Sequence, residues 1–197
     1  MNLADMRARV REDLQDTDEA NYRWTDDEVD GAIERVVREF SLVYPLQEED
    51  KITTTADDKE LDISTLADLL KVASVEYLLD LEPPYYQRFT TWGQKLYMAD
   101  KGDGTKKARV RWHKWHTLDA ASSTIPEQFE ELIVLGATGY LATSASVYTV
   151  DRATIAGRFA TANFLKWGQQ RLDRYETKLK AIARDSRVIP KELYVEE

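Results

Sequence analysis

TIPEQFEELIVLGATGYLATSASV, residues Thr124 to Val147, is the stretch that decides the fold of this chain. Ser123 or Thr124 can cap a helix at its start, and Pro126 suits the first turn. Glutamates follow, where the positive end of a helix dipole favours carboxylates, and the remainder is apolar or small. The stretch therefore predicts one long, buried helix.

Two glycines, Gly136 and Gly139, lie inside this predicted helix. Each costs on the order of 1 kcal/mol relative to alanine, so they need a structural reason. The close approach of a second helix is such a reason, because small residues let two helices come nearer than the usual ~8–10 Å. Residues 153–162, which include Ala156 and Gly157, make the next predicted helix the expected partner. From sequence, this contact could form within one chain or between two copies.

Two further helices are predicted near the N-terminus. Residues 2–14 repeat apolar side chains at spacings of three and four, which is typical of a short amphipathic helix. Its arginines, Arg7, Arg9 and Arg11, are expected on the solvated face. The second helix starts at residue 25 and is expected to end before Pro45, because proline cannot continue a helix.

The start of this second helix is the clearest local signal in the chain, the hexapeptide Trp24-Thr25-Asp26-Asp27-Glu28-Val29. Thr25 is a good N-cap and Glu28 follows three residues later, which makes a capping box. Trp24 and Val29 occupy the positions of a hydrophobic staple. The three consecutive carboxylates are interpreted as compensation of the helix dipole rather than as metal ligands.

From residue 51 the hydrophobic period changes to that of strands. Residues 107–118 alternate most regularly, with Ala108, Val110 and Trp112 on one face. The other expected strands lie within residues 52–55, 61–63, 71–81, 87–92 and 94–98. Leu69 and Leu70 are expected in a short helical turn or a loop.

The predicted fold is α+β and mainly α. Residues 1–50 and 119–186 form a helical bundle, and residues 51–118 form a small antiparallel β module inserted between the N-terminal and C-terminal helix pairs. Residues 187–197 form an extended tail. Apolar residues in a tail too short to fold alone indicate docking on another surface, although packing on its own domain or disorder would also fit.

Composition narrows the function. The formal net charge is −9 and the pI about 4.9, which opposes nonspecific DNA binding because that affinity comes largely from cationic contacts to phosphate. The chain has no cysteine, which excludes disulfides and thiolate sites. The N-terminus lacks a signal-peptide core, and no apolar run approaches the roughly 20 residues of a membrane span. A protein made in a cytoplasm, without a membrane partner, is expected.

A search for chemistry finds no catalytic motif. The two histidines, His113 and His116, would face opposite sides of the strand predicted for residues 107–118, so they would not share a metal. Phosphate loops, nucleophile elbows and HExxH motifs are absent from the sequence. We therefore expect no catalytic residue, no metal and no cofactor, and the protein is not expected to be an enzyme.

One stretch of the sequence is also compatible with a different class of function, the binding of nucleic acid. Arg109, Arg111 and Lys114, together with the tryptophans near them, resemble a basic, aromatic strand that stacks single-stranded nucleic acid. The other interpretation, which the net charge favours, is a sheet with one wet face whose long side chains cover the tryptophans.

The layout resembles the head–tail connector (adaptor) proteins of tailed bacteriophages. The matching residues are Trp24 to Val29, Ala32 to Phe40, His116-Thr117-Leu118, Thr124-Ile125-Pro126 and Leu135 to Ala142. The chain departs from the smallest members of that family by its β module and looks closer to the longer adaptors.

The resemblance implies a structural protein of the virion neck. Such adaptors form a ring, commonly of twelve copies, that extends the DNA channel beneath the portal. The partners it implies are the portal protein, neighbouring copies and the next neck or tail protein, while DNA passes without specific binding. By position, the tail residues that it implies for portal binding are Val188, Ile189, Leu193, Tyr194 and Val195. Another neck or tail-completion protein would fit the same residues.

Overall fold

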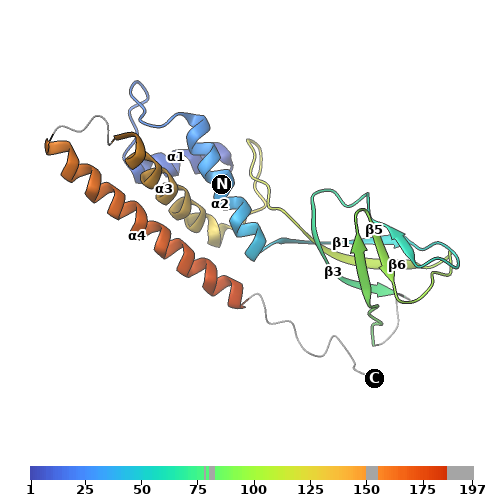
Figure 1. Ribbon diagram of the computed structural model, residues 1–197. Coiled ribbons are helices and arrows are strands. Elements are labelled where there is room, and N and C mark those ends of the chain that lie inside the picture. Colours follow the sequence, from blue (N-terminus) through green and yellow to red (C-terminus); the bar gives the residue numbers. More distant parts are fainter. Residues whose placement is uncertain (78, 80–82, 150–154, 186–197) are drawn as a thin grey trace. The chain divides into compact units, whose positions relative to one another are not determined.

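The computed structural model describes residues 1–77, 79, 83–149 and 155–185, with side chains described outside residues 145–162 (Figure 1). It contains four helices and two small antiparallel sheets, so the predicted α+β class is confirmed. The chain separates into two compact units. Pro45–Trp115 forms the β unit, and Met1–Tyr44 together with the described residues from His116 onward forms the helical unit.

The helical unit is a four-helix assembly in which the second and third helices each contact the other three. Its elements are α1 (Leu3–Leu14), α2 (Asp26–Val43), α3 (Glu127–Thr149) and α4 (Ile155–Asp185). The helix predicted from Thr124 is α3, and it packs against α1, α2 and α4 (Figure 1). Its middle is apolar on nearly every side, with Ile133, Val134 and Ala137 fully buried. The stretch from Thr124 to Val147 therefore contributes a central, buried helix to this unit.

The predicted N-terminal cap is present in α2 but not in α3. The capping box of α2 is confirmed, because the Thr25 side chain accepts from the Glu28 amide and the Glu28 carboxylate accepts from the Thr25 amide. The predicted cap of α3 is wrong. The helix begins only at Glu127, and the Thr124 hydroxyl instead accepts from the Thr117 amide, which closes the loop before the helix.

The β unit contains two three-stranded antiparallel sheets, with strand orders β1-β6-β3 and β2-β5-β4. Its strands are β1 (Leu46–Thr53), β2 (Glu60–Asp62), β3 (Leu69–Tyr77), β4 (Phe89–Trp92), β5 (Lys95–Met98) and β6 (Lys107–Lys114). Both sheets contribute to one apolar core, to which β6 adds Ala108, Val110 and Trp112 as its alternation predicts. Each inner strand thus has one face on this core.

The structure corrects three of the predicted boundaries. The first strand begins at Leu46 rather than at residue 51, because Pro45 ends the helix and an extended chain follows at once. Leu69 and Leu70 belong to β3 rather than to a turn. The last strand ends at Lys114, four residues before the predicted limit of 118.

The close approach expected at the two glycines occurs within one chain. A Cβ atom on Gly136 would lie 2.9 Å from Val36 Cγ1 and 3.1 Å from Tyr175 Cδ2. A Cβ atom on Gly139 would lie 2.9 Å from Leu172 Cγ and 3.2 Å from the Leu172 backbone nitrogen. Glycine is required here because α2, α3 and α4 meet without space for a methyl group.

The prediction of which part of the next helix approaches these glycines was wrong. The segment of α4 that approaches them contains Leu172 and Tyr175, not residues 153–162, because the middle of this long helix lies against the middle of α3. Ala156 and Gly157 belong to α4, but their surroundings lie outside the described side chains. The second half of α4 contains many charged residues, yet it buries Tyr175, which is 1% exposed.

Candidate interaction surfaces

The basic strand of the β unit is neutralised by its neighbours. Arg109 donates to Glu76 on β3 at 2.8 Å, and Arg111 donates to the Tyr86 hydroxyl at 2.8 Å and lies 3.5 Å from Glu49 on β1. Trp112 is buried in the core and is therefore not available to stack on a base. These contacts favour the interpretation of this strand as an ordinary sheet with one wet face.

The two histidines lie in different units. His113 belongs to β6, whereas His116 is buried in the helical unit. The Nε2 atom of His116 lies 2.9 Å from the Tyr44 carbonyl, and its Nδ1 atom lies 3.1 Å from the Thr124 hydroxyl. The Nδ1 atom also lies 3.0 Å from the Thr124 carbonyl, so both ring nitrogens face a carbonyl oxygen, which can only accept. Within the described part of the chain, no group of three acidic or histidine side chains is arranged to hold a metal ion.

Acidification is expected to weaken the helical unit through His116. Burial lowers the pKa of His116 below its ordinary value, despite the hydrogen bonds to the Tyr44 and Thr124 carbonyls. A lowered pKa in the folded state means that the unfolded chain binds the proton more readily. The contribution of His116 is therefore complete above about pH 6.5, the usual histidine pKa, and is lost as the pH falls through the folded pKa.

The measurement is the free energy of unfolding at pH 7.5 and 5.5 by far-UV circular dichroism. The wild type is expected to lose more stability between these two pH values than His116→Gln, because only the wild type has the imidazole that binds a proton on unfolding. Both proteins contain the same carboxylates, so the effect of the carboxylates cancels in the comparison. Burial also lowers the pKa of His113, which lies in the β unit. The variant His113→Gln therefore measures the separate contribution of this second histidine to the loss of stability. Equal losses in the wild type and His116→Gln would contradict the assignment.

An ion cluster that the sequence analysis did not anticipate holds the start of α2. Arg11 is 4% exposed, not solvated as expected. It donates to Asp16 at 2.7 Å, to Asp26 at 2.7 Å and to the Trp24 carbonyl at 2.9 Å, while its guanidinium covers the Tyr22 ring at 3.6 Å. The hydrogen bond from Arg11 lowers the pKa of Asp26. The acidic start of α2 is therefore part of a tertiary contact as well as of the helix cap.

Arg7 extends the same cluster on the exposed side. Its guanidinium donates to Asp26 at 2.9 Å and to both carboxylate oxygens of Asp30, at 2.8 and 2.6 Å. The bidentate geometry raises the pKa of Arg7 and ties α1 to the first turns of α2. All three arginines on α1 thus have carboxylate partners in the chain, since Arg9 donates to Glu131 at 2.9 Å.

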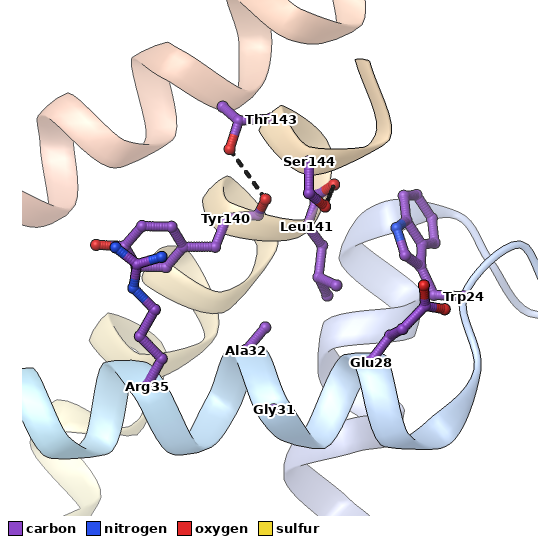
Figure 2. Close-up of a pocket in the computed structure, with 9 residues that line it drawn as sticks. All are labelled: Trp24, Glu28, Gly31, Ala32, Arg35, Tyr140, Leu141, Thr143 and Ser144. Carbon is purple, nitrogen blue, oxygen red and sulfur yellow. Dashed lines mark hydrogen bonds between the residues drawn. The ribbon is translucent and has the colours of Figure 1, made fainter. Parts of the chain in front are cut away.

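A groove runs between α2 and α3 of the helical unit (Figure 2). Its volume is about 540 Å³. Small residues line it on both helices, with Gly31 and Ala32 on α2 facing Thr143 and Ser144 on α3. Trp24 and Glu28 lie at one end and the Arg35–Tyr140 pair at the other, as Figure 2 shows. The groove therefore has a mixed polar and apolar lining with several small residues, and one charged side chain of each sign lies along it.

Hydrogen bonds connect the polar side chains at the Arg35 end of this groove. The Tyr140 hydroxyl lies 2.9 and 3.0 Å from the two carboxylate oxygens of Glu39, and Arg35 donates to Glu39 at 3.1 Å. The Arg35 guanidinium also covers the Tyr140 ring at 3.8 Å. Burial raises the pKa of Tyr140, so its hydroxyl stays protonated and donates to Glu39. These contacts give the aromatic wall of the groove a fixed position.

An exposed apolar feature lies on the β unit. Trp92 is 81% exposed and is the last residue of β4, next to the hairpin turn at Gly93. Gly93 has a φ of +59°, which favours glycine and permits the tight turn. The indole is therefore presented at the tip of a two-stranded hairpin.

The residues expected to bind the portal, Val188 to Val195, lie outside the described residues. None of the described helices is both long enough and apolar enough to cross a membrane.

Comparison with known proteins finds little. No protein-family model and no curated protein matches the chain. Among solved structures, a chain described as "Virion of native gene transfer agent (GTA) particle" is similar with a TM-score of 0.29 and 9% sequence identity, over 72% of this chain and 77% of that chain. A similarity of this degree assigns the chain to no family.

Proposed function

We propose that this chain is a structural head–tail connector of a tailed bacteriophage, a neck protein of the virion. Copies of it would form a ring beneath the portal, commonly of twelve, extend the DNA channel and receive the next neck or tail protein. It is made in the host cytoplasm before assembly, catalyses no reaction and needs no cofactor.

One observation carries the proposal. The two separated motifs that resemble the connector family meet in a single helical core. Val36 from the first motif lies against Gly136 from the second, and Glu39 accepts from Tyr140. Residues about a hundred positions apart in the sequence therefore pack against each other, which supports the interpretation of the two motifs as parts of one pattern.

Charge supports the same role. Residues 1–44 contain twelve Asp or Glu and six Arg, and the whole chain has a net charge of −9. A ring of such subunits would offer DNA a mostly repulsive lumen in which the duplex slides without sticking. The alternative of a nucleic-acid-binding protein is less favoured, because Arg109 and Arg111 already have carboxylate and hydroxyl partners.

Binding to a portal ring tests the proposal. We expect native mass spectrometry to show several copies added to a portal ring from the same genome. The tail is proposed to anchor the chain, so a variant that lacks residues 187–197 should bind more weakly by at least about tenfold, or about 1.4 kcal/mol. A wild-type chain that does not bind the portal at saturating concentration would contradict the connector proposal. Unchanged binding of the truncated variant would remove only the role of the tail.

A further inference from the structure

The helical unit has an acidic surface at one end, formed by residues 12–30. This segment includes the loop between α1 and α2 and contains nine Asp or Glu and one Arg. Arginines of α1 contact three of these carboxylates. Glu19 and Asp27 are exposed, and no ion pair within the described part of the chain includes either of them. The acidic surface therefore carries negative charge that the chain itself does not neutralise.

The same unit has a basic surface on α4, formed by residues 174–184. This segment contains four Lys or Arg and one Glu. Arg174, Lys178 and Arg184 are exposed, and among the residues that the structure describes none of them has an ion-pair partner. Arg174 and Lys178 lie one helical turn apart, where like charges repel each other. A negatively charged partner outside the chain would relieve that repulsion.

The two surfaces lie too far apart to meet within one copy. Trp24, beside the loop of the acidic surface, stacks with Phe164 at 6.2 Å, so this loop lies near the first half of α4. Lys178 follows Phe164 by 14 residues, which corresponds to about 21 Å along the helix axis. Figure 1 shows the loop between α1 and α2 at one end of the helical unit and the end of α4 at the other.

We propose that the basic surface of one copy packs on the acidic surface of a neighbouring copy. DNA is the less suitable partner for the basic surface, because the exposed carboxylates of Asp173 and Glu176 lie on the same part of α4 and the whole chain has a net charge of −9. A second copy always brings the complementary charge. The inference rests on the proposed connector function, for which it names the contact between neighbouring copies.

The arrangement is compatible with a ring and with an acidic channel. The two surfaces are different parts of the same molecule, so the contact is heterologous and each copy can both give and receive it. A heterologous contact that closes by rotation generates a ring. Pairing between copies neutralises equal numbers of each sign, so the excess of acidic residues in every copy remains for the channel.

Charge reversal with rescue tests the contact, and native mass spectrometry with the portal ring measures how many copies bind. Arg174→Glu with Lys178→Glu should raise the concentration that half-fills the ring by at least about tenfold, because like charges would then face each other. Glu19→Lys with Asp27→Lys should have the same effect. A chain with all four changes should recover most of the loss, since the contact is restored with its signs exchanged.

A matched variant controls for net charge. Lys59→Glu with Lys107→Glu reverses two exposed lysines of the β unit and changes the net charge by the same amount as the α4 variant, so it should fill the ring like the wild type. Circular dichroism checks that every variant is folded. The rescue also separates a lost contact from a misfolded chain, because a second pair of reversals would not repair a folding defect.

Three results would overturn the inference. The first is an α4 variant that fills the ring like the wild type, and the second is a four-change chain that assembles no better than the two-change chains. The third is an α4 variant that still fills the ring but loses binding to duplex DNA in a gel shift, which would assign the basic surface to DNA. All three leave the connector function standing. If no wild-type copies bind the portal ring, the connector function fails and the inference fails with it.

Discussion

Replacement of Arg11 by alanine is expected to lower the free energy of unfolding by about 3–5 kcal/mol, the usual loss when one partner of a buried ion pair is removed. Arg11 and Asp16 have side chains that are 5% and 7% exposed, so the lost guanidinium leaves Asp16 charged and poorly solvated. The same change removes the donor to the Trp24 carbonyl just before α2. Urea unfolding followed by circular dichroism measures the loss.

Two further variants distinguish the stability contribution of the buried ion pair from that of an exposed ion pair. Arg9 lies on the same helix and pairs with Glu131, but its side chain is 52% exposed, so Arg9→Ala should have a small effect. Arg11→Met combined with Asp16→Asn should recover part of the stability, because the buried charge is removed with its partner. An Arg11→Ala protein as stable as Arg9→Ala would show that the cluster contributes little.

Replacement of Gly139 by leucine is expected to unfold the helical unit of the isolated chain. Even the first added carbon would lie 2.9 Å from Leu172 Cδ2 and 3.2 Å from the Leu172 backbone nitrogen, and a backbone atom cannot rotate away. Overpacking of a well-packed core usually costs about 1–3 kcal/mol, and leucine adds three more carbons at a site that rejects one. We expect a loss above about 3 kcal/mol in thermal and urea unfolding.

Alanine at two glycines gives the matched comparison. Gly139→Ala should destabilise the protein, whereas Gly31→Ala should stabilise it by up to about 1 kcal/mol, because a Cβ atom at Gly31 meets nothing within 4 Å and alanine is the better helix former. If Gly139→Leu instead gave a folded chain that failed only to assemble on the portal, the close approach would have to lie between copies.

Local signals predicted the start of α2 and the alternation of β6. The capping box at Thr25 and Glu28 needs only residues three apart, and the alternation of β6 needs only the period of a strand. Both are therefore visible in a single sequence. The predicted cap of α3 failed because Thr124 had a competing partner in Thr117, across a loop whose closure no local pattern shows.

Contacts that depend on the alignment of whole elements could not be predicted. Arg11 looked like a solvated residue because its partners, Asp16 and Asp26, come from a loop and a helix that fold back on α1. The sequence indicated that Gly139 needs a close neighbour, but only the packing of α4 on α3 identifies Leu172. The groove between α2 and α3 likewise needs the positions of both helices, whereas the apolar end of β4 at Trp92 was present in the sequence pattern.

Cryo-electron microscopy of the neck of the purified virion tests the connector proposal most directly. We expect a ring of copies of this chain directly beneath the portal, with the helical unit and the β unit each recognisable in every copy. The lumen of that ring should be mainly acidic. A neck in which another protein occupies this position, or a ring whose lumen is lined mainly by arginine and lysine, would contradict the proposal.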